Sequence, residues 1–206
     1  MCHKLDPIFF KRLAGKNPDE VCRQSLAGFD YKRKVYRIVA LGQEYEVDPE
    51  NKEIKPLSPG EHTVSVELGL LILVYLLEAK DIALKGRWVS EFNLRGGAMF
   101  FRGPHAIRND EIAGRFGYDL EGFKETCRAL GGSPVEMGDV AFRFQVLPRL
   151  PVVVVLWYGD EEFDPSAKML MDATIDQHLP LDVIFGMSLE LIGRIVGKTL
   201  WGSSDA

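Results

Sequence analysis

The chain has 206 residues, of which 46% are hydrophobic and 27% charged, and its formal net charge is -5. This balance is typical of a globular protein with enough apolar side chains for one sizeable core. The densest basic stretch is the short "YKRKVYR", so the chain lacks the clustered positive charge that phosphate backbones require. The longest apolar run, "LGLLILVYLL", is shorter than the about 20 residues that span a bilayer. We therefore expect neither a nucleic-acid partner nor a membrane protein.

The three cysteines are widely spaced, and the sequence has no CxxC motif. This excludes a zinc ribbon, a thioredoxin-like motif and an iron–sulfur cluster. Unpaired thiols are typical of a reducing compartment, and the first residues form no apolar signal core. The sequence therefore predicts a cytoplasmic protein.

Residues 6–28 predict two short helices, because "DP" and "NP" each place a capping side chain before a proline at the first helical position. Gly28 is expected to stop the second helix. Residues 35–56 alternate and break at turn residues, which predicts a small antiparallel meander within residues 28–62. The segment 63–80 is apolar on nearly all sides and predicts a buried helix.

Residues 86–101 predict strand or loop, followed by a helix that ends at Phe116, and "DLEGFKETCRALGG" is typical of an amphipathic helix capped by Asp119. "VAFRFQVL" alternates like a half-buried strand, and "PVVVVLWY" reads as a central strand paired antiparallel to it. A last amphipathic helix follows residue 180, and residues 201–206 are expected to fray. The predicted fold is a single α+β domain over residues 1–206, with an antiparallel sheet flanked by N-terminal, central and C-terminal helices.

Three stretches carry a family resemblance: "KGRWVSEFNLRGGAMFFRGPH", "LGGSPVEMGDVAFRFQVLPRLPVVVVLWYGDEEF" and "MLMDATIDQHLPLD". Together they resemble the domain of unknown function 3786 family of anaerobic bacteria and archaea. The resemblance implies a role in anaerobic metabolism but no established reaction. Some relatives carry an attached iron–sulfur module, which implies redox or corrinoid-dependent partner proteins. This chain lacks the cysteines for that module. Met171, Asp164 and Leu181 depart from the family pattern, and Leu181 stands where an acid is common.

The first candidate site is acidic. Asp160, Glu161 and Glu162 follow the expected central strand, where the backbone turns into solvent. A metal site of Asp160, Asp172, His178 and Asp182 would give the mixed nitrogen and oxygen ligation that zinc, iron or manganese accepts. Glu161 or Glu162 would then be a general base. The alternative is a solvated turn with helix-capping aspartates.

The second candidate site is "NLRGGAMFFRGPH". Gly96 and Gly97 would expose backbone N–H groups, while Arg95, Arg102 and His105 would donate to a carboxylate or phosphate. The structural alternative is that the glycines form turns and the arginines pair with the acids of the first site. Arg95 or Arg149 paired with Asp160 or Glu161 would explain both motifs by structure alone.

The aromatic residues near these motifs suggest a third possibility. Trp88 and Trp157, with Phe100 and Phe101, could form the floor of a pocket for a tetrapyrrole, with His105 or His178 as axial ligand. The alternative is that these rings are core residues.

The sequence therefore favours a small-ligand-binding, cofactor-binding or accessory protein, with a pocket between the glycine–arginine loop and the acidic strand end. A metal-dependent enzyme, a tetrapyrrole- or corrinoid-binding protein and a protein-interaction role are the alternatives. The possible cofactors are a divalent metal or a tetrapyrrole, the partner is a small molecule or a protein, and no catalytic residue is assigned. The expected ligand-binding residues are Trp88, Arg95, Gly96, Gly97, Arg102, His105, Trp157, Asp160, Glu161 and Glu162.

Overall fold

A computed structural model describes residues 5–57 and 64–200. The predicted tail at 201–206 and the end of the predicted meander region lie outside the described residues. The helices are α1 (Pro7–Ala14), α2 (Pro18–Ser25), α3 (Val66–Glu78), α4 (Gly97–Phe100), α5 (Asn109–Phe116), α6 (Leu120–Ala129), α7 (Ile175–His178) and α8 (Leu181–Val196), with single 3-10 turns at Glu91–Asn93 and Gly103–His105. The strands are β1 (Gly28–Asp30), β2 (Val35–Ala40), β3 (Gln43–Asp48), β4 (Glu53–Pro56), β5 (Trp88–Val89), β6 (Ser133–Val135), β7 (Val140–Leu147), β8 (Leu150–Trp157) and β9 (Ser166–Asp172).

The N-terminal third folds as the sequence predicts. The Asp6 side chain accepts a hydrogen bond from the Ile8 N–H, and the Asn17 side chain accepts one from the Asp19 N–H, so both predicted caps are confirmed. Helix α2 ends on Leu26 in the left-handed conformation rather than at Gly28, which opens β1. Strands β1 to β4 then form an antiparallel meander in chain order.

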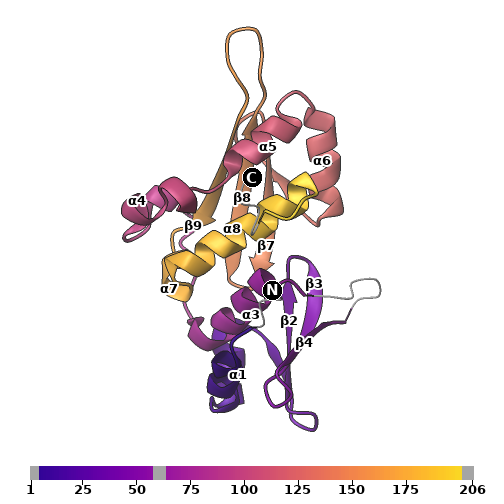
Figure 1. The fold of residues 1–206 in the computed structure, drawn as a ribbon, viewed down its shortest axis with the longest axis vertical. Coiled ribbons are helices and arrows are strands. Elements are labelled where there is room, and N and C mark those ends of the chain that lie inside the picture. The colour runs from indigo at the N-terminus through magenta and orange to yellow at the C-terminus, as the bar shows by residue number, and fades with distance from the viewer. Residues whose placement is uncertain (1–4, 58–63, 201–206) are drawn as a thin grey trace.

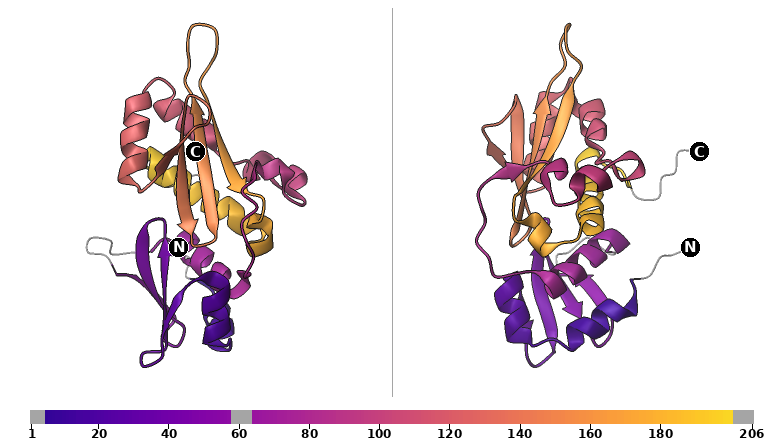
Figure 2. Two further views of the ribbon diagram at one scale, coloured as in Figure 1. Left: turned by 180° about the vertical axis from the view of Figure 1, so that it is seen from behind. Right: turned by 90° about the vertical axis from the view of Figure 1, so that its left-hand side faces the viewer.

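The larger sheet is also antiparallel, with strand order β5-β9-β8-β7-β6. The predicted antiparallel pair of β7 and β8 is confirmed, and β8 is the central strand, buried along nearly its whole length. Strand β9 pairs with β8 on the other side. Figure 2 shows the helices gathered on one side of this sheet.

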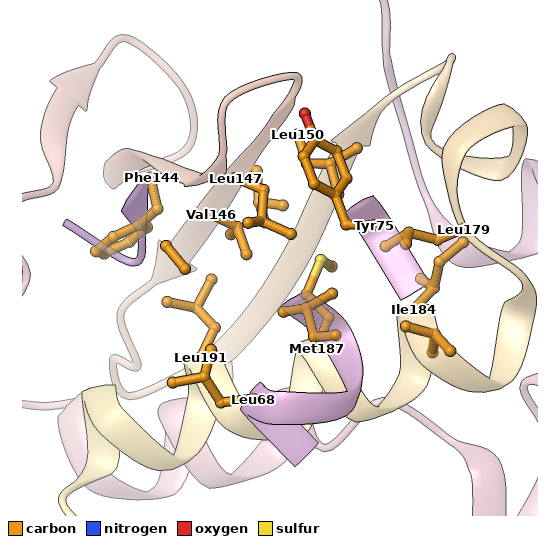
Figure 3. Packing of buried hydrophobic residues seen from close by; sticks show 14 of the residues in the cluster. Leu68, Tyr75, Phe144, Val146, Leu147, Leu150, Leu179, Ile184, Met187 and Leu191 are labelled. Atoms are coloured by element: carbon orange, nitrogen blue, oxygen red, sulfur yellow. The ribbon is translucent and has the colours of Figure 1, made fainter. Parts of the chain in front are cut away.

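One hydrophobic core joins both sheets, which confirms a single α+β domain. Helix α3 lies between the two sheets and packs against α8 (Figure 1). In Figure 3, Leu68 and Tyr75 of α3 lie among side chains of β7, β8 and α8. The Leu41 N–H, in the turn after β2, donates to the Val146 carbonyl in β7 at 2.9 Å, so the backbone also links the sheets.

Arg149 fixes the turn between β7 and β8 against the N-terminal helices. Its guanidinium donates to the carbonyls of Gln24 at 2.7 Å, Arg23 at 3.1 Å and Ile82 at 3.2 Å, and to the Asp81 carboxylate at 2.5 Å. The Arg149 side chain therefore caps the C-terminal end of α2 and connects it to the β7–β8 turn.

The segment before α5 differs from the prediction. The helix expected up to Phe116 begins only at Asn109. Gly103 adopts a positive φ of 54°, and Pro104 follows it, so the chain makes a 3-10 turn there instead of continuing a helix. Within residues 5–57 and 64–200, no helix is long and apolar enough to cross a bilayer.

Candidate functional site

The acidic residues lie at the tip of the β8–β9 hairpin, which we define as residues 157–165 and call the hairpin tip. The Asp160 carboxylate accepts hydrogen bonds from the Glu162 and Phe163 N–H groups, both at 2.8 Å. These two bonds lower the pKa of Asp160. Asp160 therefore caps a turn, and Glu161 and Glu162 are exposed beside it, so the solvated turn of the structural alternative is confirmed. The helix-capping aspartates predicted in that alternative are wrong, because strand β9 follows Asp164 and α8 has Pro180 at its N-cap with no side-chain hydrogen bond.

The glycine–arginine loop uses its glycines for packing. A Cβ on Gly97 would lie 2.0 Å from the Glu91 carbonyl oxygen, so only glycine permits this close approach. Gly96 has a positive φ of 78°. The side chains of Arg95 and Arg102 are exposed, and the His105 ring, also exposed, stacks on Phe100 with 4.7 Å between ring centroids.

The structure does not bring this loop and the hairpin tip together. Figures 1 and 2 show the hairpin tip projecting at one end of the molecule, with α4 at the side, well separated from it in both views. Arg95 meets a different acid, because its backbone N–H donates to the Asp176 carboxylate at 3.2 Å. Within the described residues, no ion pair joins Arg95 or Arg149 to Asp160 or Glu161.

The four predicted metal ligands are also dispersed. Asp160 precedes β9 and Asp172 ends it, and a seven-residue strand extends about 20 Å between its end residues. In the part of the chain that the structure describes, no group of three or more His, Cys, Asp or Glu side chains is arranged to hold a metal ion. The predicted set is therefore not assembled into one site here.

Asp172 is occupied by backbone donors. Its carboxylate accepts from the N–H groups of Gly86 at 2.7 Å and Lys85 at 3.2 Å, and from the hydroxyl of Thr174 at 2.7 Å. Burial alone would raise the pKa of Asp172, but these hydrogen bonds outweigh it and lower the pKa. The carboxylate fixes the loop that leads into β5.

The aromatic residues do not form one pocket floor. Trp88 pairs with Asp172 at one end of β9, while Trp157 pairs with Ser166 at the other end, again about 20 Å away. Phe101 is buried in the core and Phe100 packs on His105. These positions give a tetrapyrrole no continuous aromatic wall.

Two of the predicted residues, His178 and Asp182, do line a cavity, which we call the His178 cavity. It has a volume of about 450 Å³ and lies between α1, α3 and the segment from α7 into α8. Apolar side chains from α3 and α8, including Leu70, Leu77 and Val183, line one part of it. The charged lining residues are Arg12, Glu78, Lys80, Asp176 and Asp182.

His178 is the one lining histidine and is only 1% exposed. Its Nδ1 accepts a hydrogen bond from the Lys80 N–H at 3.2 Å, so the proton of the neutral ring lies on Nε2. Burial, with the positive charges of Arg149 and Lys80, lowers the pKa of His178 to about 4. Among the described residues, Nε2 has no hydrogen-bond partner. At neutral pH the ring is therefore an uncharged donor with a free N–H.

The charges at the cavity are partly balanced. Arg12 and Glu78 form an ion pair with 2.6 Å between nitrogen and oxygen, and Asp176 accepts the Arg95 N–H. Lys80 and Asp182 are exposed at the rim. The cavity thus has an apolar wall and rim charges of both signs, and the buried His178 ring belongs to its lining.

Sequence reasoning did not place α1 and α3 at this site. His178 and Lys80 are 98 positions apart, and no local motif indicates that they meet. The available signal was the sequence "EAK", residues 78–80, which follows the long apolar run of α3 and indicates where the chain reaches the surface.

Comparison with known families matches residues 17–194 to the family described as Domain of unknown function (DUF3786). The chain belongs to this family. The match confirms the resemblance found in the sequence, and it includes His178, Lys80 and the hairpin tip but not Arg12. No curated protein and no solved structure matches the chain.

Proposed function

We propose that this DUF3786 protein binds a small molecule in the His178 cavity. The observation that carries the proposal is the unpartnered Nε2–H of His178, a donor on a buried ring that lines a cavity of about 450 Å³. A buried donor without an acceptor costs about 1–3 kcal/mol, and a ligand acceptor would recover that free energy. Apolar cavities with a few oriented polar groups are typical ligand sites.

The electrostatics favour binding over acid–base catalysis. A general base acts best with a pKa near the working pH, whereas the pKa of His178 is about 4. Its Nδ1 is already occupied by the Lys80 N–H, and Nε2 carries the proton. We therefore expect His178 to orient an acceptor atom of the ligand and not to remove a proton. A cytoplasmic accessory role in anaerobic metabolism, implied by the resemblance, is part of the same proposal.

The first test is to extract and identify small molecules that copurify with the full chain, by mass spectrometry after anaerobic purification. The substitution Leu70→Trp would fill the cavity from α3, and Leu84→Trp, at an exposed residue that does not line the cavity, is the matched control. We expect one stoichiometric organic molecule in the wild type and the control, and about tenfold less in Leu70→Trp with an unchanged circular dichroism spectrum.

Equal retention by both variants, or no bound molecule, would contradict the proposed site. The same samples are analysed for zinc, iron, cobalt, nickel and manganese. A stoichiometric metal would instead support the metal-dependent or tetrapyrrole alternatives.

A further inference from the structure

The hairpin tip and the adjoining turn between α5 and α6 expose four large aromatic side chains. Phe163 is 68% exposed, and Tyr118, from the turn between α5 and α6, is 75% exposed. Trp157 and Tyr158 are also exposed. Clusters of this kind on soluble proteins mark interaction sites, and Trp, Tyr and Phe are the residues enriched at the centres of protein interfaces.

Within residues 150–167 the charged side chains are all acidic, and the exposed Arg115 lies three positions before Tyr118 in the adjoining helix α5. Asp160, Glu161, Glu162 and Asp164 are all exposed, and the sequence has no Lys or Arg between Arg149 and Lys168. None of the four carboxylates forms an ion pair within residues 5–57 and 64–200. A complementary partner surface is therefore basic around an apolar centre.

The base of the tip is held in place by contacts to two neighbouring turns. The Gly159 N–H donates to the Gly117 carbonyl at 2.9 Å, and the Tyr158 N–H donates to the Asp139 carboxylate at 3.0 Å. A Cβ on Gly117 would lie 2.3 Å from Pro165, so the chain packs closely there. A loop ordered before binding loses less conformational entropy in a complex.

We propose that the hairpin tip docks a protein partner, with Phe163 inserted into an apolar pocket bordered by lysine or arginine side chains. In Figure 1 the tip projects at the top, while α1, α3 and α7, which surround the His178 cavity, lie in the lower half, so the partner leaves the cavity open. The inference does not depend on the proposed ligand, because no residue of the tip lines the His178 cavity. It assigns Trp157, Glu161 and Glu162 to a protein interface.

The test places a photo-crosslinking phenylalanine derivative at position 163 of the full chain, in an extract of source cells. The matched control carries it at Val39, which is also exposed but lies in β2 of the small sheet. We expect one protein adduct at position 163 and none at position 39. The captured protein is identified, purified and titrated against the wild type and two variants.

The first variant is Phe163→Ala, and the second combines Glu161→Gln, Glu162→Gln and Asp164→Asn. Asp160 is kept because it caps the turn. We expect each variant to raise the dissociation constant about tenfold with an unchanged Tm, and added salt to weaken binding of the wild type. An adduct yield at position 163 no higher than at position 39, or binding that is insensitive to both variants, would overturn the proposal. Calcium binding by the tip without a protein adduct would also overturn it.

Discussion

The pH dependence of stability gives a direct test of the environment of His178. The folded protein lowers its pKa from the ordinary value of 6.5 to about 4. Above about pH 6.5 the ring is neutral in both the folded and the unfolded chain, and stability is unaffected. Between pH 6.5 and 4 the unfolded chain binds a proton that the folded chain does not, so the free energy of unfolding decreases as the pH falls.

The magnitude follows from the difference between the two pKa values. A difference of about 2.5 units corresponds to about 3 kcal/mol in total. Between pH 7 and pH 5 we expect the free energy of unfolding to fall by about 2 kcal/mol, mostly because His178 is protonated in the unfolded chain. Protonation at Nδ1 would also remove the hydrogen bond from the Lys80 N–H, which is the structural reason that the folded state resists it.

The assay is urea unfolding at pH 7 and pH 5 for the wild type, His178→Gln and His105→Gln. Gln keeps a polar group of similar size but does not titrate. We expect the wild type and His105→Gln, which changes an exposed residue, to lose about 2 kcal/mol. The His178→Gln variant should lose less than about 0.5 kcal/mol. The same loss in all three proteins would refute the assignment of a buried neutral ring to His178.

Two further substitutions test the assignments made for the family motifs. Arg149→Met should lower the free energy of unfolding by about 3 kcal/mol or more, because three backbone carbonyls lose a charged donor. The control Arg143→Met changes an exposed residue and should alter the free energy of unfolding by less than about 0.5 kcal/mol in the same urea titration. Gly97→Ala should cost about 2–3 kcal/mol because its Cβ would overlap the Glu91 carbonyl, while Gly186→Ala, in open space within α8, should be neutral or raise Tm slightly. A tolerated Gly97→Ala would contradict the packing role assigned to this glycine.

The elements that could be predicted are those whose signals are local. Asp6 and Asn17 each precede a proline, and both cap a helix as expected. The alternation of residues 140–147 and the apolar run that follows predicted β7, β8 and their pairing. A strand buried on one face alternates apolar and polar residues, whereas a strand buried on both faces is apolar throughout. These signals depend on neighbours a few positions away, and tertiary contacts did not override them.

Strand β9 shows where local signals were insufficient. Its inward residues are Ala167, Met169 and Met171, which alternate correctly but belong to types with little strand preference, and Lys168 lies between them. These residue types do not predict a strand, and helical spacing would instead have placed Asp172 beside Asp176. As a strand it carries Asp172 to the far end of β9 from the hairpin tip.

That strand explains why the predicted residues of the site separate into groups with different roles. Asp160, Glu161 and Glu162 stay at the tip, while His178 reaches the cavity beside α3, and about 20 Å of β9 lies between the two regions. These residues are close in sequence, which suggested one common site. Because the strand between them is extended, it holds the residues at its two ends far apart. The decisive neighbour of His178 is the Lys80 N–H, and that contact depends on the packing of α3 against α1, α2 and α8. The role of His178 is therefore set by its contact with the residue that follows α3. The acidic residues near His178 in the sequence do not predict that contact.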